Sequence, residues 1–321
     1  MDQLTVKVLR KTQEAQDIAS FELARADGGP LPAFSAGSHI DVQVPGGKGP
    51  LVRQYSLCND DQDAHRYRIA VLRDAASRGG SAGMHEQVQE GDLLTIGTPR
   101  NHFPLVRAER QLLLAGGIGV TPLLSMAQRL ATVGADFALH YCTRSAARTA
   151  FRAEIAAAPW APRVHLHFDD GDAAQKLDAA RLLAAPAAGT HLYVCGPTGF
   201  IDHVVGTATA QGWDKANVHL EYFGAAPQDT SGDGSFEVRI ASSGQTLRVA
   251  PDQTVTQALL AHGIEIMTSC EQGVCGTCIT RVLQGECEHR DLYFTDAEKA
   301  ANDQFTPCCS RAKGPLLVLD L

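Results

Sequence analysis

The stretch from Ser269 to Cys278 reads SCEQGVCGTC, and it decides the fold of the C-terminal part of the chain. Its cysteines, Cys270, Cys275 and Cys278, have the spacing C-x4-C-x2-C, and Cys308 follows after 29 intervening residues. This is the spacing of the four thiolates that hold a plant-type 2Fe–2S cluster. The two glycines inside the loop suit a backbone that must wrap closely around such a cluster.

Zinc and disulfides are the alternative uses of these cysteines. Structural zinc sites pair their ligands as C-x2-4-C twice, or add histidines at short spacing, whereas here only Cys275 and Cys278 pair in this way. Disulfides need an oxidising compartment, but the chain has nine cysteines, an odd number, and its start, MDQLTVKV, has no secretory signal pattern. We therefore favour the cluster and expect the protein in the cytoplasm. Cys309 adjoins Cys308 and competes for the fourth position. The segment after the pair resembles the closing strand of a ferredoxin, and we assign the fourth position to Cys308 because the first cysteine of the pair fits the spacing of that family.

The composition is that of an ordinary globular protein with two or three domains. The chain has 321 residues, of which 44% are hydrophobic and 20% charged. Its net charge of -8 argues against a nucleic-acid partner, which requires a basic face. No apolar run approaches the ~20 residues that span a bilayer. We expect a monomer, and the acidic balance is compatible with docking onto a basic protein partner.

A small, polar stretch rich in glycine and proline divides the chain at residues 225–235, and we interpret it as a linker. Beyond it, residues 236–321 form a unit of their own. FEVRI and TLRVA alternate on either side of a turn, which predicts a β-hairpin, and TVTQALLAHG predicts a helix that ends at Gly263. Hairpin, helix and cysteine loop together resemble the β-grasp fold of plant-type ferredoxins.

The middle region, residues 106–224, begins with a buried strand, a glycine-rich turn and an amphipathic helix in QLLLAGGIGVTPLLSMAQRL. Such a turn directs backbone N–H groups at a helix N-terminus towards a pyrophosphate. Proline stands where the fingerprint G-x-G-x-x-G has its third glycine, so a purely structural turn is the alternative. A later strand, HLYVCGPTGF, brings more residues to the strand end at which open parallel sheets bind ligands. The candidate nucleotide-binding residues are Gly116, Gly117, Gly119, Thr121, Pro122, Cys195, Gly196 and Pro197.

Both motifs resemble the nicotinamide-nucleotide motifs of the ferredoxin–NADP reductase superfamily, which implies that Cys195 lies near the site of hydride transfer. The alternative for Cys195 is a small buried residue at a strand end. A 2′-hydroxyl on the ribose suits a carboxylate, whereas a 2′-phosphate needs Arg or Lys. The acidic end of VHLHFDDGD, in which we assign Asp170 to the ribose, favours NADH, and Arg144 is evidence for NADPH.

A flavin is needed between nicotinamide and cluster, because NADH gives two electrons as a hydride and a 2Fe–2S centre takes one. In residues 1–105, RQYSLCN resembles the flavin motif of the same superfamily. The resemblance implies that Arg53 pairs with the phosphate, that Tyr55 lies at the ring, and that Ser56, followed by Leu57, lies near flavin N5. An ordinary strand with a buried tyrosine is the alternative.

Downstream, SRGGSAGMH predicts a short helix whose start, Gly79, Gly80 and Ser81, forms an anion site. The same region has several short strands separated by Gly/Pro turns, which predict a small antiparallel barrel. No platform for an adenine is apparent, which favours FMN over FAD.

The whole chain resembles the phthalate dioxygenase reductase family, which includes vanillate demethylase reductases. The resemblance implies an antiparallel β-barrel flavin domain, an α/β parallel-sheet nucleotide domain and a β-grasp ferredoxin domain, with FMN, NADH and a 2Fe–2S cluster. Phe223 in EYFG matches an aromatic residue that lies against the flavin in this family, although hydrophobic packing would also explain it. Ser56, Cys195 and Phe223 are the expected catalytic residues.

The resemblance further implies an oxidoreductase that passes electrons from NADH to a Rieske-type terminal oxygenase acting on an aromatic compound. A reductase for a cytochrome P450 or a carnitine-type oxygenase is the alternative within the same class. A 2Fe–2S redox sensor is the alternative from another class, but it needs an output module, for which three domains leave no room. A reductase that releases free FMN is disfavoured by the tethered ferredoxin unit.

Overall fold

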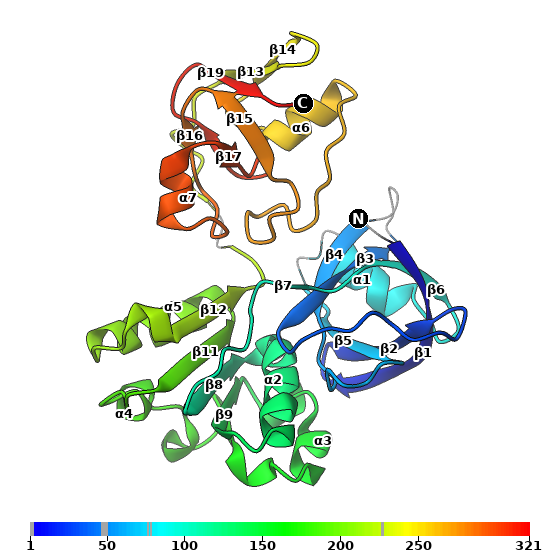
Figure 1. Cartoon of the computed structure of the whole chain (residues 1–321), viewed down its shortest axis with the longest axis vertical. Helices are drawn as coiled ribbons and strands as arrows, with labels where there is room; N and C mark the ends of the chain where they lie inside the picture. The colour runs from blue at the N-terminus through cyan, green and yellow to red at the C-terminus, as the bar shows by residue number, and fades with distance from the viewer. Residues whose placement is uncertain (1–2, 46–50, 76, 78, 226–227) are drawn as a thin grey trace. The chain divides into compact units, whose positions relative to one another are not determined.

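The computed structural model describes residues 3–45, 51–75, 77, 79–225 and 228–321 (Figure 1). The chain divides into two compact units, Met1–Phe223 and Gly224–Leu321. Within the described ranges, no helix combines the length and apolar character needed to cross a membrane.

The first sheet is an antiparallel barrel, as its alternating sequence predicts. Its strands pair in the order β4-β3-β6-β1-β2-β5, and β7 pairs with β3. Alternate side chains point inward and form one core, which Met84 of the short helix α1 (Gly80–Glu86) completes. The strands are β1 (Gln3–Ala15), β2 (Ile18–Arg25), β3 (Ser38–Val44), β4 (Leu51–Ser56), β5 (Tyr67–Leu72), β6 (Leu93–Gly97) and β7 (Arg100–Asn101).

The second sheet of this unit is wholly parallel, with the order β10-β9-β8-β11-β12. Strand order therefore reverses between β8 and β11, which is the position where doubly wound sheets bind their ligands. The strands are β8 (Arg110–Gly116), β9 (Asp136–Thr143), β10 (Val164–Phe168), β11 (Thr190–Gly196) and β12 (Val218–Tyr222). The helices are α2 (Val120–Thr132), α3 (Arg152–Ala157), α4 (Ala179–Leu182) and α5 (Thr198–Ala210). Short 3-10 turns lie at Gly117–Gly119, Ala146–Arg148, Ala161–Arg163, Ala173–Gln175 and Lys215–Asn217.

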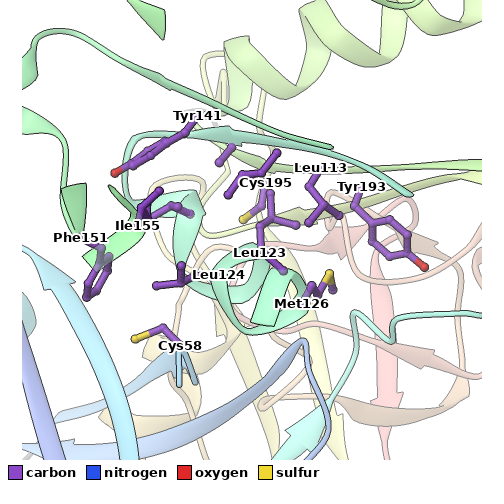
Figure 2. Packing of buried hydrophobic residues seen from close by; sticks show 14 of the residues in the cluster. Cys58, Leu113, Leu123, Leu124, Met126, Tyr141, Phe151, Ile155, Tyr193 and Cys195 are labelled. Carbon is purple, nitrogen blue, oxygen red and sulfur yellow. The ribbon is translucent and has the colours of Figure 1, made fainter. Parts of the chain in front are cut away.

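Helices cover both faces of the parallel sheet. Figure 1 shows α2 and α3 on the face towards the barrel and α4 and α5 on the other. The core beneath α2 continues into the barrel, because Cys58 and Phe103 belong to the same buried cluster as Leu124 and Cys195. Figure 2 shows Cys58 directly below α2. Barrel and parallel sheet are thus joined by a continuous apolar core.

The second unit has its own core and a five-stranded sheet in the order β14-β13-β19-β15-β17. The predicted hairpin is present, with β13 (Phe236–Ile240) antiparallel to β14 (Thr246–Val249). The predicted helix is α6 (Val255–Ala261), capped by Thr254 and followed by Gly263 at φ 75°. The remaining elements are β15 (Thr280–Gln284), β16 (Cys287–Glu288), α7 (Asp296–Ala301), β17 (Gln304–Phe305), β18 (Arg311–Ala312) and β19 (Leu316–Leu319).

Candidate functional site

The end of β4 presents the predicted flavin motif. Ser56 is buried and pairs across the ladder with His39 of β3. The next residue, Leu57, lies in the barrel core and donates its N–H to the Ser38 carbonyl at 2.8 Å. Tyr55 packs against the same core, and burial raises the pKa of its phenol. The end of β4 is therefore fixed by its pairing with β3 and by packing in the barrel core.

Arg53 lies across the first turn of α1. A Cβ on Gly80 would stand 2.7 Å from Arg53 Nε, so glycine is what lets the guanidinium come this close. Gly79, at the N-cap, has φ 101°, a conformation that glycine adopts without strain. Ser81 Oγ accepts a hydrogen bond from the Asp74 N–H at 3.2 Å. The structure thus brings together the guanidinium and the glycine-rich turn, and their combined chemistry fits a phosphate.

The two nucleotide motifs meet at the point where strand order reverses. Ala115, at the end of β8, is paired with Cys195, at the end of β11. The following glycines are also in contact, since a Cβ on Gly196 would stand 2.9 Å from the Gly116 Cα. A Cβ on Gly116 would meet Pro197 at 3.0 Å. The sequence predicted both motifs, and the structure places them side by side.

Gly119 explains why the turn before α2 has to be glycine-rich. A Cβ there would stand 2.3 Å from the Cys195 carbonyl oxygen, and neither backbone can give way. Gly117 has φ 55°. Thr121 and Pro122 are buried in the first turn of α2, where the Thr121 hydroxyl donates to the Ile118 carbonyl at 3.0 Å. The turn therefore holds the start of α2 against β11, and helix starts of this kind suit a pyrophosphate.

The residues that would distinguish NADH from NADPH also lie together. Asp170 follows β10, and its N–H donates to the carbonyl of Arg144, which follows the neighbouring strand β9, at 3.2 Å. Both side chains are exposed at the ligand-binding edge of the sheet. This edge of the sheet therefore carries both a carboxylate, which suits the ribose of NADH, and a guanidinium, which suits the phosphate of NADPH. The exposed Asp169 and Asp172 add negative charge here and so favour NADH.

Glu221 is a candidate that the sequence analysis missed. It is paired with Cys195 across β11 and β12, and its Oε2 is buried with no hydrogen-bond partner in the described part of the chain. Burial raises the pKa of Glu221 to about 8. Phe223, two residues on, is 40% exposed, as a ring must be to face a ligand. The motif EYFG had drawn attention only to its phenylalanine, and the sequence pattern does not reveal that a carboxyl oxygen of the glutamate is buried.

His39 is the second missed candidate. It is 6% exposed, and its Nε2 has no partner among the described residues. Burial, and then the positive charge of Arg100, lowers the pKa of His39 to about 3, so the imidazole is neutral. Because its ladder partner is Ser56, the unsatisfied nitrogen lies in the neighbourhood of the flavin motif. A buried polar atom of this kind is accounted for when a bound group supplies the missing partner.

The four predicted cluster ligands converge in the second unit. The Cys270 thiol interacts with those of Cys275 and Cys308, and the Cys308 thiol interacts with those of Cys278 and its neighbour Cys309. Backbone N–H groups within the loop also point to sulfur, with Thr277 N 3.5 Å from Cys275 Sγ. In the described ranges, no group of three or more His, Cys, Asp or Glu side chains is placed so that it could hold a single metal ion. The convergence therefore rests on these thiol contacts, which fit a cluster held by four cysteines.

The glycines of the cysteine loop are required by their surroundings. Gly273 has φ 73°, and a Cβ there would stand 2.4 Å from Cys309 Sγ. Gly276 has φ 69°, and a Cβ there would stand 2.4 Å from the Tyr293 ring. Cys309 also lies 3.2 Å from the Thr306 hydroxyl. Its thiol thus packs behind the loop, whereas the Cys308 thiol interacts with those of Cys270 and Cys278.

Comparisons with known proteins agree with this arrangement. Residues 238–313 match the 2Fe-2S iron-sulfur cluster binding domain, and residues 102–218 match the N-terminal domain of dimethylamine monooxygenase subunit DmmA-like proteins. A vanillate O-demethylase oxidoreductase of Pseudomonas sp. strain HR199 is 59% identical, covering 96% of each chain. A carnitine monooxygenase reductase subunit of Escherichia coli is 42% identical, covering 98% of each chain. The solved structure of a phthalate dioxygenase reductase is 40% identical, with a TM-score of 0.78 over 99% of this chain and 98% of the other.

Fold and site together define an oxidoreductase that combines a barrel, a nucleotide-type α/β domain and a 2Fe–2S ferredoxin domain. The chain belongs to the family of oxygenase reductases that includes the vanillate O-demethylase oxidoreductases and phthalate dioxygenase reductase.

Proposed function

We propose that the protein is the NADH-dependent reductase of a two-component oxygenase, that it binds FMN and a 2Fe–2S cluster, and that its acceptor is a Rieske-type aromatic oxygenase or O-demethylase. The observation that carries the proposal is the meeting of β8 and β11 at the switch point, in one compact unit with the flavin motif. The three cysteines of the loop and Cys308, all in the second unit, would supply the exit for electrons. We further propose that it acts as a monomer, in the cytoplasm, where thiols stay reduced.

The residues of the first unit bind and orient. In this proposal the glycine turn Gly116–Gly119 and the start of α2 hold the pyrophosphate of NADH, and Asp170 accepts a hydrogen bond from the ribose. Arg53 and the start of α1 hold the FMN phosphate. Ser56 lies on the barrel side of the reacting atoms, and Cys195 and Glu221 on the nucleotide side. Phe223 covers the flavin ring when no nicotinamide is present.

FMN, when bound, accepts two electrons as a hydride and releases them one at a time, and the cluster takes single electrons. The protein contributes shape and charge to this chemistry. Burial of its carboxyl raises the pKa of Glu221 to about 8, which favours the neutral form of this side chain at neutral pH. The apolar core around Cys195, which is paired with Glu221, excludes water from the end of β11.

An anaerobic titration with NADH tests the proposal. The purified protein is followed by visible absorbance and low-temperature EPR, and the released flavin is identified. We expect bleaching of the flavin, the signal of a reduced 2Fe–2S cluster and FMN in the extract. Flavin reduction without a cluster signal, in a protein shown to contain iron, would contradict the proposed path.

The acceptor requires a separate test. Product formation from vanillate by a purified vanillate O-demethylase oxygenase, driven by NADH through this reductase, is the expected result. A carnitine-type oxygenase and a cytochrome P450, assayed in parallel, are the competing acceptors. The 42% identity to a carnitine monooxygenase reductase subunit makes the former the closer alternative. Faster turnover with either would replace the Rieske-type aromatic oxygenase as acceptor.

A further inference from the structure

Arg68 and Glu154 join the barrel to the nucleotide domain through a two-pronged ion pair. Arg68 belongs to β5 of the barrel, and Glu154 belongs to α3 beside the parallel sheet. The two guanidinium nitrogens of Arg68 donate to the two carboxylate oxygens of Glu154, at 2.6 and 2.8 Å. This bidentate geometry fixes distance and orientation together, which a single point contact does not.

Arg68 also forms hydrogen bonds with Cys58 and Asn59, which end the stretch RQYSLCN that carries the flavin motif. One guanidinium nitrogen donates to the Cys58 carbonyl at 3.2 Å, and the Arg68 backbone N–H donates to Asn59 Oδ1 at 2.8 Å. The Arg68 carbonyl accepts from the Cys58 N–H at 2.8 Å. Cys58 is only two residues beyond Ser56. A direct chain of contacts thus runs from α3 through Arg68 to the strand end that carries Ser56.

The nucleotide side of the contact is also tightly defined. Phe151 caps α3 in the left-handed region, at φ 60°, a strained conformation for a bulky residue. Its ring is buried, and the Arg68 guanidinium lies 4.9 Å from its centroid. From α2, Gln128 Nε2 approaches the same Cys58 carbonyl at 3.5 Å. Both helices on this face therefore converge on Arg68 and the Cys58 carbonyl.

The pair is buried on its arginine side. The Arg68 side chain is 15% exposed and that of Glu154 is 39% exposed, and both line a surface pocket of about 280 Å³ together with Trp160. Two further ion pairs join the barrel to the nucleotide domain, Arg148 to Asp17 at 3.3 Å and Arg129 to Asp61 at 3.8 Å. The Arg68–Glu154 pair differs from them in its bidentate geometry and in the hydrogen bond from Arg68 to the Cys58 carbonyl.

We infer that Arg68 and Glu154 are positioning residues, which set the approach of the nicotinamide-binding domain to the flavin strand. The inference rests on the proposed function, in which hydride passes between these two domains. Neither side chain touches the reacting atoms. Their effect is on the geometry of the transfer rather than on the affinity for NADH, because the nucleotide motifs at β8 and β11 lie elsewhere on the sheet.

Glu154→Gln in the complete, flavin-loaded protein is the test, since it retains the size of the side chain and removes its charge. We expect the limiting rate constant of flavin reduction in anaerobic stopped flow to fall about tenfold, with the Kd for NADH within about twofold of wild type. The nicotinamide–flavin charge-transfer absorbance should weaken as well, a change that a loss of stability alone does not produce. Arg68→Lys, which keeps the charge but loses the two-pronged geometry, should act in the same direction.

Arg66→Gln is the matched control. Arg66 lines the same cavity, but it pairs with Asp63 at 2.8 Å and Glu22 at 3.6 Å, both within the barrel. It should leave the rate constant and the charge-transfer band unchanged. A wild-type rate in Glu154→Gln, or an equal loss in Arg66→Gln, would overturn the inference. Failure of NADH to reduce the flavin of the wild-type protein would instead overturn the proposed function, and the inference with it.

Discussion

At the scale of single residues, the adjacent thiols of Cys308 and Cys309 have different surroundings. Cys308 contacts Cys270 and Cys278, whereas Cys309 packs behind Gly273 and against the Thr306 hydroxyl. We predict that Cys308→Ser loses the 2Fe–2S EPR signal and most of the bound iron. Cys309→Ser should retain both, because its thiol is replaced by a smaller hydroxyl outside the ligand set. Iron analysis and EPR of the two purified variants decide the assignment, and the reverse pattern would make Cys309 the ligand.

The raised pKa of Glu221 should make the stability of the fold depend on pH. The pKa of this carboxyl is 4.5 in its ordinary state and is raised to about 8 in the folded protein. Between these values the unfolded chain loses a proton that the folded chain keeps, so the carboxyl lowers stability progressively as the pH rises. In Glu221→Gln the side chain is neutral in both states. We therefore predict that the Tm of the variant minus the Tm of wild type increases between pH 5 and pH 8, by on the order of 5 °C. Above pH 8 this difference should become constant.

Thermal melts across this pH range check the Glu221 prediction. The exposed Glu109 is the matched control, and Glu109→Gln should give no such pH-dependent gain. A Tm difference between Glu221→Gln and wild type that is the same at every pH would contradict a raised pKa of the Glu221 carboxyl in the folded protein.

At the scale of elements, the turn before α2 packs against the end of β11 with no room for a side chain at Gly119. Gly119→Ala would place a Cβ 2.3 Å from the Cys195 carbonyl oxygen, so α2 has to move away from β11. We predict a loss of about 1–3 kcal/mol in the free energy of unfolding. We also predict at least a tenfold weaker Kd for NADH, because the helix start is displaced from the pyrophosphate. Gly206→Ala in α5, where an added Cβ meets nothing within 4 Å, is the control and should be neutral or slightly stabilising.

The elements also show what the sequence could and could not predict. The hairpin at Phe236, the helix after Thr254 and the cysteine loop were predictable because their signals are local in sequence. The strand ends at Ala115 and Cys195 could be expected to meet, because parallel sheets bind ligands at one edge. Glu221 and His39 could not be found in this way. Each has a polar atom that the tertiary fold buries without a hydrogen-bond partner among the described residues. No local sequence pattern indicates such burial for a glutamate in an edge strand or a histidine in a barrel strand.

At the scale of the whole molecule, the two units correspond to the two halves of electron transfer. The first contains every residue proposed to bind NADH and FMN, and the second contains all four proposed cluster ligands. Each has its own buried core, one around Leu124 and Cys195 and the other around Val238 and Leu317. The step that requires both units is therefore the transfer of single electrons from flavin to cluster.

Separating the units should separate the activities. We predict that residues 1–223, produced alone and loaded with FMN, are reduced by NADH and reduce ferricyanide, whereas residues 224–321 alone show the 2Fe–2S EPR signal after reduction by dithionite. In a mixture, NADH should reduce the cluster at a rate that rises with fragment concentration. It should remain below the rate in the intact chain at micromolar concentrations, because a short tether supplies an effective concentration in the millimolar range. A second fragment that fails to bind iron would show that the ferredoxin unit needs the first unit to fold, and the separate cores would then not be sufficient for independent stability.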